Sequence, residues 1–178
     1  MRKKLGIPVG LCLVLIGVLS ACGQTDEQSV QPITGLPEGT DGYQWWNDTT
    51  FYQIFVRSFY DSDGDGIGDF NGIVEKLDYL NDGDPRTSSD LGITGIWLMP
   101  INPSPSYHGY DVIDYYDVNP DYGTMDDFKH LLDECHARGI RVIMDMVLNH
   151  TSSEHPWFQE ARANADSERR DWYIWSND

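Results

Sequence analysis

Three apolar runs, separated by two helical patterns, constrain most strongly what this chain can fold into. The runs are 51–56 (FYQIFV), 93–99 (ITGIWLM) and 140–148 (IRVIMDMVL). Short, nearly continuous apolar runs of this kind are typical of strands in a parallel sheet that is covered on both faces. The sequence therefore predicts three buried strands.

Both intervening segments have the apolar spacing of an amphipathic helix. Segment 71–80 places four apolar side chains on one helical face: Ile73, Val74, Leu77 and Leu80. In the second segment Thr124 is a predicted N-cap, and Asp127 three residues later makes the start close to a capping box. Gly139 follows as the stop signal. Strand, helix, strand, helix, strand predicts an α/β fold with a parallel sheet.

Each predicted strand is followed by a polar loop rather than by a phosphate-binding glycine motif. Neither G-x-G-x-x-G nor a Walker sequence follows the first run, which argues against a doubly wound nucleotide-binding fold. In a (β/α)₈ barrel the loops after the strands share one rim, and ligands bind at that rim. We therefore expect the three loops to converge on one site.

The charge of the chain excludes one class of partner. The 178 residues carry a formal net charge of −17, and 29 of them are Asp or Glu. Such a surface repels phosphate backbones, so we expect no nucleic-acid partner. It suits a neutral ligand or bound cations.

Residues 1–22 are predicted to be a bacterial lipoprotein signal. A basic start is followed by an apolar stretch at 5–19 that is too short to span a bilayer comfortably. The sequence LSAC at 19–22 resembles a lipoprotein box, in which Cys22 is lipidated and becomes the mature N-terminus. This predicts an extracytoplasmic protein held on the cell membrane through Cys22; the alternative is an ordinary cleaved signal with an incidental cysteine.

The polar residues 23–43, which contain glycine and proline, are predicted to form a flexible tether. With Cys12 removed in the signal and Cys22 lipidated, Cys135 is the only cysteine left, so no internal disulfide is expected.

The first loop, 61–69 (DSDGDGIGD), has the composition of a cation site. Carboxylates alternate with small residues, and glycines let the backbone curl, as Ca²⁺ requires. An EF-hand is excluded because its twelfth position needs Glu, where this chain has Gly72. The alternative is a merely solvated acidic turn, but four carboxylates within nine residues repel one another without a counter-ion.

The second and third loops carry candidate sugar contacts. The sequence YHGYD at 107–111 offers aromatic faces for the C–H face of a sugar and polar groups for its hydroxyls; packing within the loop is the alternative. In the third, Asp145 stands in an apolar run and must be paired or functional. Asp145 as a nucleophile with His150 as a base is conceivable, but a structural role for such a pair is favoured.

Segment 45–175 resembles the start of the α-amylase superfamily of glycoside hydrolases along its whole length. The matching motifs are YQIFVRSF, DSDGDGIGD, GIWLMPINPS, HGYD, YGTMDDF and DMVLNH, in that order. The resemblance implies the beginning of a catalytic (β/α)₈ TIM barrel at 44–150, about three βα units, and the start of an inserted B domain at 151–178.

The resemblance also implies roles for individual residues. Tyr110 matches a tyrosine that stacks on the sugar ring, and His150 and His108 match sugar-contacting histidines; Asp111 belongs to the same motif. Asp145 matches an aspartate that supports the site. Calcium ligands are implied at Asp61, Asp63, Asp65, the carbonyl of Ile67 and Asp69, with Asn149 as a ligand of a second calcium.

The implied chemistry is retaining hydrolysis of α-1,4-glucosidic bonds in starch or maltooligosaccharides by two carboxylates. In the family these residues follow later strands, so the nucleophile and the acid are expected beyond Asp178. We therefore expect the 178 residues to be the N-terminal part of an α-amylase, and neither to fold stably nor to hydrolyse starch alone. A monomer is expected.

Other activities stay open at this point. An oligo-1,6-glucosidase, an α-glucosidase or a cyclodextrin-cleaving enzyme is the alternative within the superfamily. A non-catalytic glycan-binding surface lipoprotein is the alternative of another class, and a calcium-binding lipoprotein without sugar chemistry leaves HGYD and DMVLNH unexplained.

Overall fold

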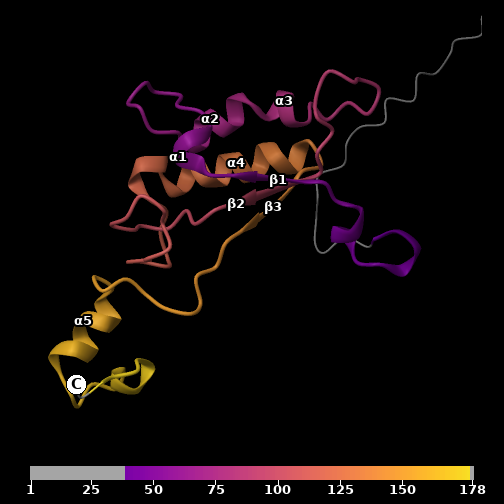
Figure 1. Cartoon of the computed structure of the whole chain (residues 1–178). Helices are drawn as coiled ribbons and strands as arrows, with labels where there is room; N and C mark the ends of the chain where they lie inside the picture. The colour runs from indigo at the N-terminus through magenta and orange to yellow at the C-terminus, as the bar shows by residue number, and fades with distance from the viewer. Residues whose placement is uncertain (1–38, 177–178) are drawn as a thin grey trace, which may run out of the picture.

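The computed structural model describes residues 39–176 (Figure 1). The predicted signal, Cys22 and most of the predicted tether lie outside the described residues. Within 39–176, no helix has the length and apolar character needed to cross a membrane.

The chain alternates strands and helices in the predicted order. The strands are β1 (Phe51–Ile54), β2 (Gly95–Leu98) and β3 (Arg141–Met144). The α-helices are α1 (Val56–Phe59), α2 (Phe70–Glu75), α3 (Leu77–Leu80), α4 (Met125–Ala137) and α5 (Pro156–Ala163). Four 3₁₀ turns complete the described elements: η1 (Thr40–Gly42), η2 (Trp45–Asp48), η3 (Pro120–Tyr122) and η4 (Arg170–Trp172).

The three strands form one parallel sheet in the order β1-β2-β3. Ile54 lies opposite Leu98, which lies opposite Met144. This row faces the helices, and Ile54 and Leu98 are fully buried with Phe70 of α2 and Leu131 of α4. Helices α2, α3 and α4 lie on one side of the sheet (Figure 1). The predicted α/β fold with a parallel sheet is confirmed.

The other face of the sheet is not covered by these helices, so the prediction that the strands are buried on both faces is wrong for the described residues. Because side chains alternate along a strand, Gln53, Trp97 and Ile143 form a row across this face. Gln53 is exposed, and Trp97 and Ile143 are 39% and 37% exposed. On this open face Trp97 lies close to Asp145, which follows β3.

The predicted strands and the first predicted helix are shorter than the apolar runs suggested. β3 ends at Met144, where its partner β2 also ends, although the apolar run continues to residue 148. The helix predicted over 71–80 is two helices, because the backbone of Lys76 (φ −107°, ψ 3°) leaves the helical range. The Lys76 ammonium lies 3.7 Å from the centre of the Tyr60 ring, a cation–π contact at this break.

Helix α4 begins as predicted. The Thr124 hydroxyl accepts from the Asp127 amide at 3.2 Å, and the Asp127 carboxylate accepts from the Thr124 amide at 2.8 Å, so the capping box is complete. Cys135 is buried in the core below this helix, and burial raises the pKa of its thiol to about 12. Cys135 is a free thiol in the described chain.

The ends of the described chain lie outside the sheet and its helices. At the start, the Thr40 amide donates to the Asp48 carboxylate at 2.7 Å, so ordered contacts begin before residue 43, where the tether was predicted to end. Beyond β3 an extended segment leads to α5, which lies apart from the sheet (Figure 1). There Phe158 contacts Tyr173 and Trp175 at ring-centre distances of 5.1 and 5.8 Å.

Candidate functional site

Two of the predicted loops meet at the carboxyl ends of the strands. The Tyr110 hydroxyl, from the loop after β2, donates to Oδ2 of Asp145 at 2.5 Å, just beyond β3. This bond and burial raise the pKa of Tyr110. Nε2 of His150 lies 2.9 Å from the Tyr110 carbonyl oxygen. The structure thus brings together Tyr110, Asp145 and His150 from two of the three loops that were expected to converge.

The hydrogen bonds of His150 fix its tautomer. The Tyr110 carbonyl can only accept, so Nε2 carries the proton; on the other side Nδ2 of Asn149 lies 3.1 Å from Nδ1 and donates to it. Both ring nitrogens of the neutral imidazole are therefore engaged. A ligand that binds either ring nitrogen displaces one of these two partners.

Asp145 is paired, as its position in an apolar run predicted. Its second oxygen, Oδ1, accepts from the indole Nε1 of Trp97 at 2.6 Å. Sequence reasoning missed Trp97, because this residue lies in the apolar run 93–99, which indicated only a buried strand. The available signal was strand register, because Trp97 and residue 145 share one face of the sheet.

The HGYD loop is organised by its own polar groups. Nδ1 of His108 accepts from the Tyr110 amide at 3.0 Å, and the two rings lie 6.0 Å apart. Asp111 accepts from the hydroxyls of Ser104, at 2.5 Å, and Ser106. Burial acts to raise the pKa of Asp111, but these serine bonds outweigh it, and the pKa lies below its ordinary value. The Asp111 carboxylate therefore points back into its loop.

Gly109 has a structural role in the HGYD loop. In the structure its φ is +80°, and a Cβ there would lie 3.2 Å from the Pro100 carbonyl oxygen. Gly109 thus lets the loop turn and pack on Pro100, which positions Tyr110 next to it.

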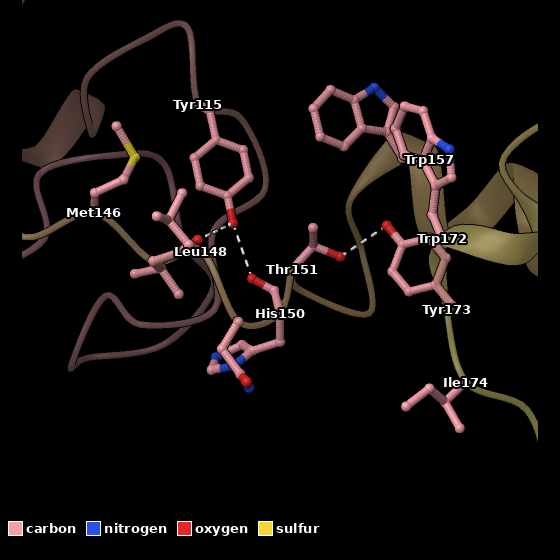
Figure 2. Close-up of a pocket in the computed structure, with 11 residues that line it drawn as sticks. Tyr115, Met146, Leu148, His150, Thr151, Trp157, Trp172, Tyr173 and Ile174 are labelled. Carbon is pink, nitrogen blue, oxygen red and sulfur yellow. Dashed lines mark hydrogen bonds between the residues drawn. The ribbon is translucent and has the colours of Figure 1, made fainter.

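Tyr115 is a second residue whose role sequence reasoning did not assign. Its hydroxyl lies 2.7 Å from the Val147 carbonyl and 2.9 Å from the His150 carbonyl, so it holds the backbone that carries His150 (Figure 2). Its ring lies 5.6 Å from His155 and 6.2 Å from Trp157. Tyr115 thereby links the loop after β2 to the start of α5.

A hollow of about 580 Å³ opens beside His150 (Figure 2). Aromatic and aliphatic side chains form most of its wall, among them Leu148 and Ile174, which are 85% and 103% exposed. The hollow is lined by Tyr115, Met146, Val147, Leu148, Asn149, His150, Thr151, Trp157, Trp172, Tyr173 and Ile174.

The acidic loop brings three of its carboxylates together. One oxygen from each of Asp61, Asp63 and Asp65 lies within 4.8 Å of the others. The amides of Gly66 and Gly64 donate to Asp61 at 2.8 and 2.7 Å, and these bonds lower the pKa of Asp61. Three convergent carboxylates are a donor set that fits a hard cation such as Ca²⁺.

Asp69 is not part of that group of three. It is 9% exposed and accepts from the Gly72 amide at 2.6 Å and from the amide and hydroxyl of Ser62, both at 2.8 Å. Asp69 is therefore the N-cap of α2 and a brace across the loop. The amide of Ile67 donates to Asp65 at 2.7 Å, and Asn149 lies beside His150 beyond β3.

The comparison with protein families decides the identity of the fold. The model described as "Alpha amylase, catalytic domain" matches residues 53–178. This chain belongs to the alpha-amylase family of glycoside hydrolases. The three-stranded parallel sheet is accordingly the N-terminal part of that family's (β/α)₈ barrel.

The relatives of this chain are named for several different activities. It is 53% identical over 134 residues to Alpha-amylase 3 of Dictyoglomus thermophilum, covering 75% of this chain and 25% of the relative. It is 52% identical to the oligo-1,6-glucosidase of Parageobacillus thermoglucosidasius, covering 74% and 22%. It is 42% identical to Alpha-amylase SusG of Bacteroides thetaiotaomicron, covering 93% and 24%.

Solved structures agree with this assignment. An alpha-amylase from H. orenii superposes with a TM-score of 0.71 at 65% identity, covering 73% of this chain and 27% of that one. The chain thus spans about a quarter of the length of the relatives it matches.

Proposed function

We propose that the whole protein is an α-amylase that hydrolyses α-1,4-glucosidic bonds in starch or maltooligosaccharides with retention of configuration. The observation that carries the proposal is the joined arrangement of Tyr110, Asp145 and His150 at the carboxyl ends of the strands, in a chain of this family. Relatives named alpha-amylase support the choice of substrate. The nucleophile and the acid are proposed to lie beyond residue 178.

The residues of this chain serve to bind and orient the glucan. The Tyr110 ring, 36% exposed and held through its hydroxyl by Asp145, offers a face to the apolar side of a sugar. His150 offers an imidazole whose Nε2–H exchanges its carbonyl partner for a sugar hydroxyl. His108 and Asp111 shape the loop beside Tyr110 and are proposed as further contacts. Asp145 positions Tyr110 and does not attack the substrate.

Calcium is proposed to brace the first loop. Asp61, Asp63 and Asp65, with the Ile67 carbonyl and Asp69, are proposed to hold the ion, and Asn149 a second one. Bound Ca²⁺ supplies positive charge that offsets the repulsion among these carboxylates. The test is calcium titration by calorimetry of the whole protein, in which loss of binding in Asp63→Ala supports the site and unchanged binding contradicts it.

The location and domain division are also proposals. Cys22 is proposed to carry the lipid that holds the protein on the extracytoplasmic face of the membrane, 44–150 to begin the barrel and 151–178 to begin a B domain. The separation of α5 from the sheet supports that division (Figure 1). Cys22→Ala is expected to release the protein from the membrane fraction into the medium; retention in the membrane contradicts the lipid anchor.

An oligo-1,6-glucosidase is the second candidate, because relatives with that name are 52% and 51% identical to this chain. The deciding experiment incubates the whole protein with maltoheptaose, isomaltose and β-cyclodextrin. The α-amylase proposal predicts rapid cleavage of maltoheptaose and little of isomaltose. The reverse order favours the glucosidase, and glucan binding without cleavage of any of the three favours a non-catalytic binding protein.

A further inference from the structure

We propose that Trp97 is a positioning residue for sugar binding, acting through Asp145 on Tyr110. The inference rests on the proposed function, because it concerns the site in which Tyr110 contacts a glucan. Trp97 is not assigned a sugar contact of its own. Its indole N–H is the group that acts.

The geometry gives the Asp145 carboxylate two donors, one for each oxygen. Trp97 donates to Oδ1 at 2.6 Å and Tyr110 donates to Oδ2 at 2.5 Å. An ionised carboxylate accepts only, and hydrogen bonds to it are about twice as strong as neutral ones. Two donors on opposite oxygens fix the rotation of the carboxylate. The Tyr110 hydroxyl therefore donates to one oxygen of defined position, Oδ2 of Asp145.

The two donors differ in how firmly each is held. Trp97 is part of β2, paired on both sides by β1 and β3 in the middle of the sheet. Tyr110 is on a loop, and Asp145 follows the end of β3, with its amide bonded to the Leu98 carbonyl at 2.9 Å. The rigid strand thus sets the position of the carboxylate, and the carboxylate sets the position of the loop tyrosine.

The network continues from Tyr110 to the second predicted sugar contact. The Tyr110 carbonyl accepts from Nε2 of His150 at 2.9 Å. This bond goes to the Tyr110 backbone, whereas the bond from Asp145 goes to the Tyr110 hydroxyl. The indole N–H of Trp97 therefore acts on the Tyr110 side chain, and His150 is held by the backbone of the same residue.

The test uses Trp97→Phe in the whole protein, which keeps a large aromatic ring but removes the N–H. We expect kcat/KM for maltoheptaose to fall about tenfold, as for the loss of one charge-assisted hydrogen bond, and the double variant with Tyr110→Phe to be no worse than the poorer single variant. The matched control is Trp46→Phe, at the opposite end of the sheet. Trp97→Phe activity equal to that of Trp46→Phe, or additive losses with Tyr110→Phe, overturns the inference.

A second measurement does not depend on activity. In protein labelled with ¹⁵N-tryptophan, the indole N–H signal that disappears in Trp97→Phe should be shifted downfield and exchange slowly with solvent. Asp145→Asn should move it upfield and speed its exchange at least tenfold. A signal unaffected by Asp145→Asn overturns the inference even if the wild-type protein cleaves glucans. Failure of the proposed function is distinct, because there the wild-type protein cleaves no glucan.

Discussion

Replacing Asp69 by alanine separates helix capping from calcium binding in the acidic loop. The side chain accepts three hydrogen bonds, one from Gly72 and two from Ser62, and the residue is 9% exposed. Loss of an N-cap costs about 1 kcal/mol and each bond from Ser62 to the carboxylate about 1.5 kcal/mol. In EDTA, Asp69→Ala should therefore lower the free energy of local opening of residues 60–75 by about 3–4 kcal/mol.

The assay is amide hydrogen exchange of the whole protein, followed in peptides covering residues 60–75. A loss of that size speeds exchange about 10²- to 10³-fold. Asp69→Asn should lose less, because Asn is as good an N-cap as Asp but offers Ser62 one acceptor fewer. Asp63→Ala is the matched control, since Asp63 is exposed and accepts only from the Asp65 amide among the described hydrogen bonds. If Asp69→Ala exchanges no faster than this control, the capping account is wrong.

Three further predictions concern residues around the site and in the core. Tyr115→Phe should lower the free energy of unfolding, measured with denaturant, by about 1–2 kcal/mol. It should also speed amide hydrogen exchange in the residues that follow β3. Tyr116→Phe, at an 83% exposed residue, should change neither quantity. Cys135 should resist iodoacetamide at pH 8 until urea unfolds the protein, because its pKa is about 12; mass spectrometry of native protein showing rapid labelling contradicts this. The depressed pKa of Asp111 gives stability that is present above the ordinary value of 3.8 and lost as pH falls through the lower folded value. An acid titration of stability should show that loss, and the loss should be smaller in Asp111→Asn, in which the other carboxylates with lowered pKa values, such as Asp61, still titrate.

The element types could be predicted from the sequence, because hydrophobic period and capping are local properties. Thr124 and Asp127 made their capping box where the sequence placed it. The strand ends could not be predicted, because pairing, not hydrophobicity, decides them. β3 ends at Met144 because its pairing with β2 ends at Leu98. Met146 and Leu148, which continue the apolar run, are 56% and 85% exposed.

The sequence predicted that loops meet at the site, but it did not predict which hydrogen bonds join their residues. Asp145 was expected to be paired or functional, because an unpaired carboxylate in an apolar run is costly. Naming Trp97 as one partner requires the register that places it beside residue 145, and this depends on contacts 48 residues apart in sequence. Asp69 has a role that the loop composition did not indicate, because its side chain caps α2. Its role as a calcium ligand stays a prediction.

The most direct test of the proposed function follows the hydrolysis of maltoheptaose by the whole protein with proton NMR. A retaining α-amylase releases the α-anomer of the shortened oligosaccharide first, and the β-anomer appears later by mutarotation. We predict an early α-anomer signal with loss of the α-1,4 linkage signal. An early β-anomer signal, or intact maltoheptaose after prolonged incubation with calcium, would contradict the account.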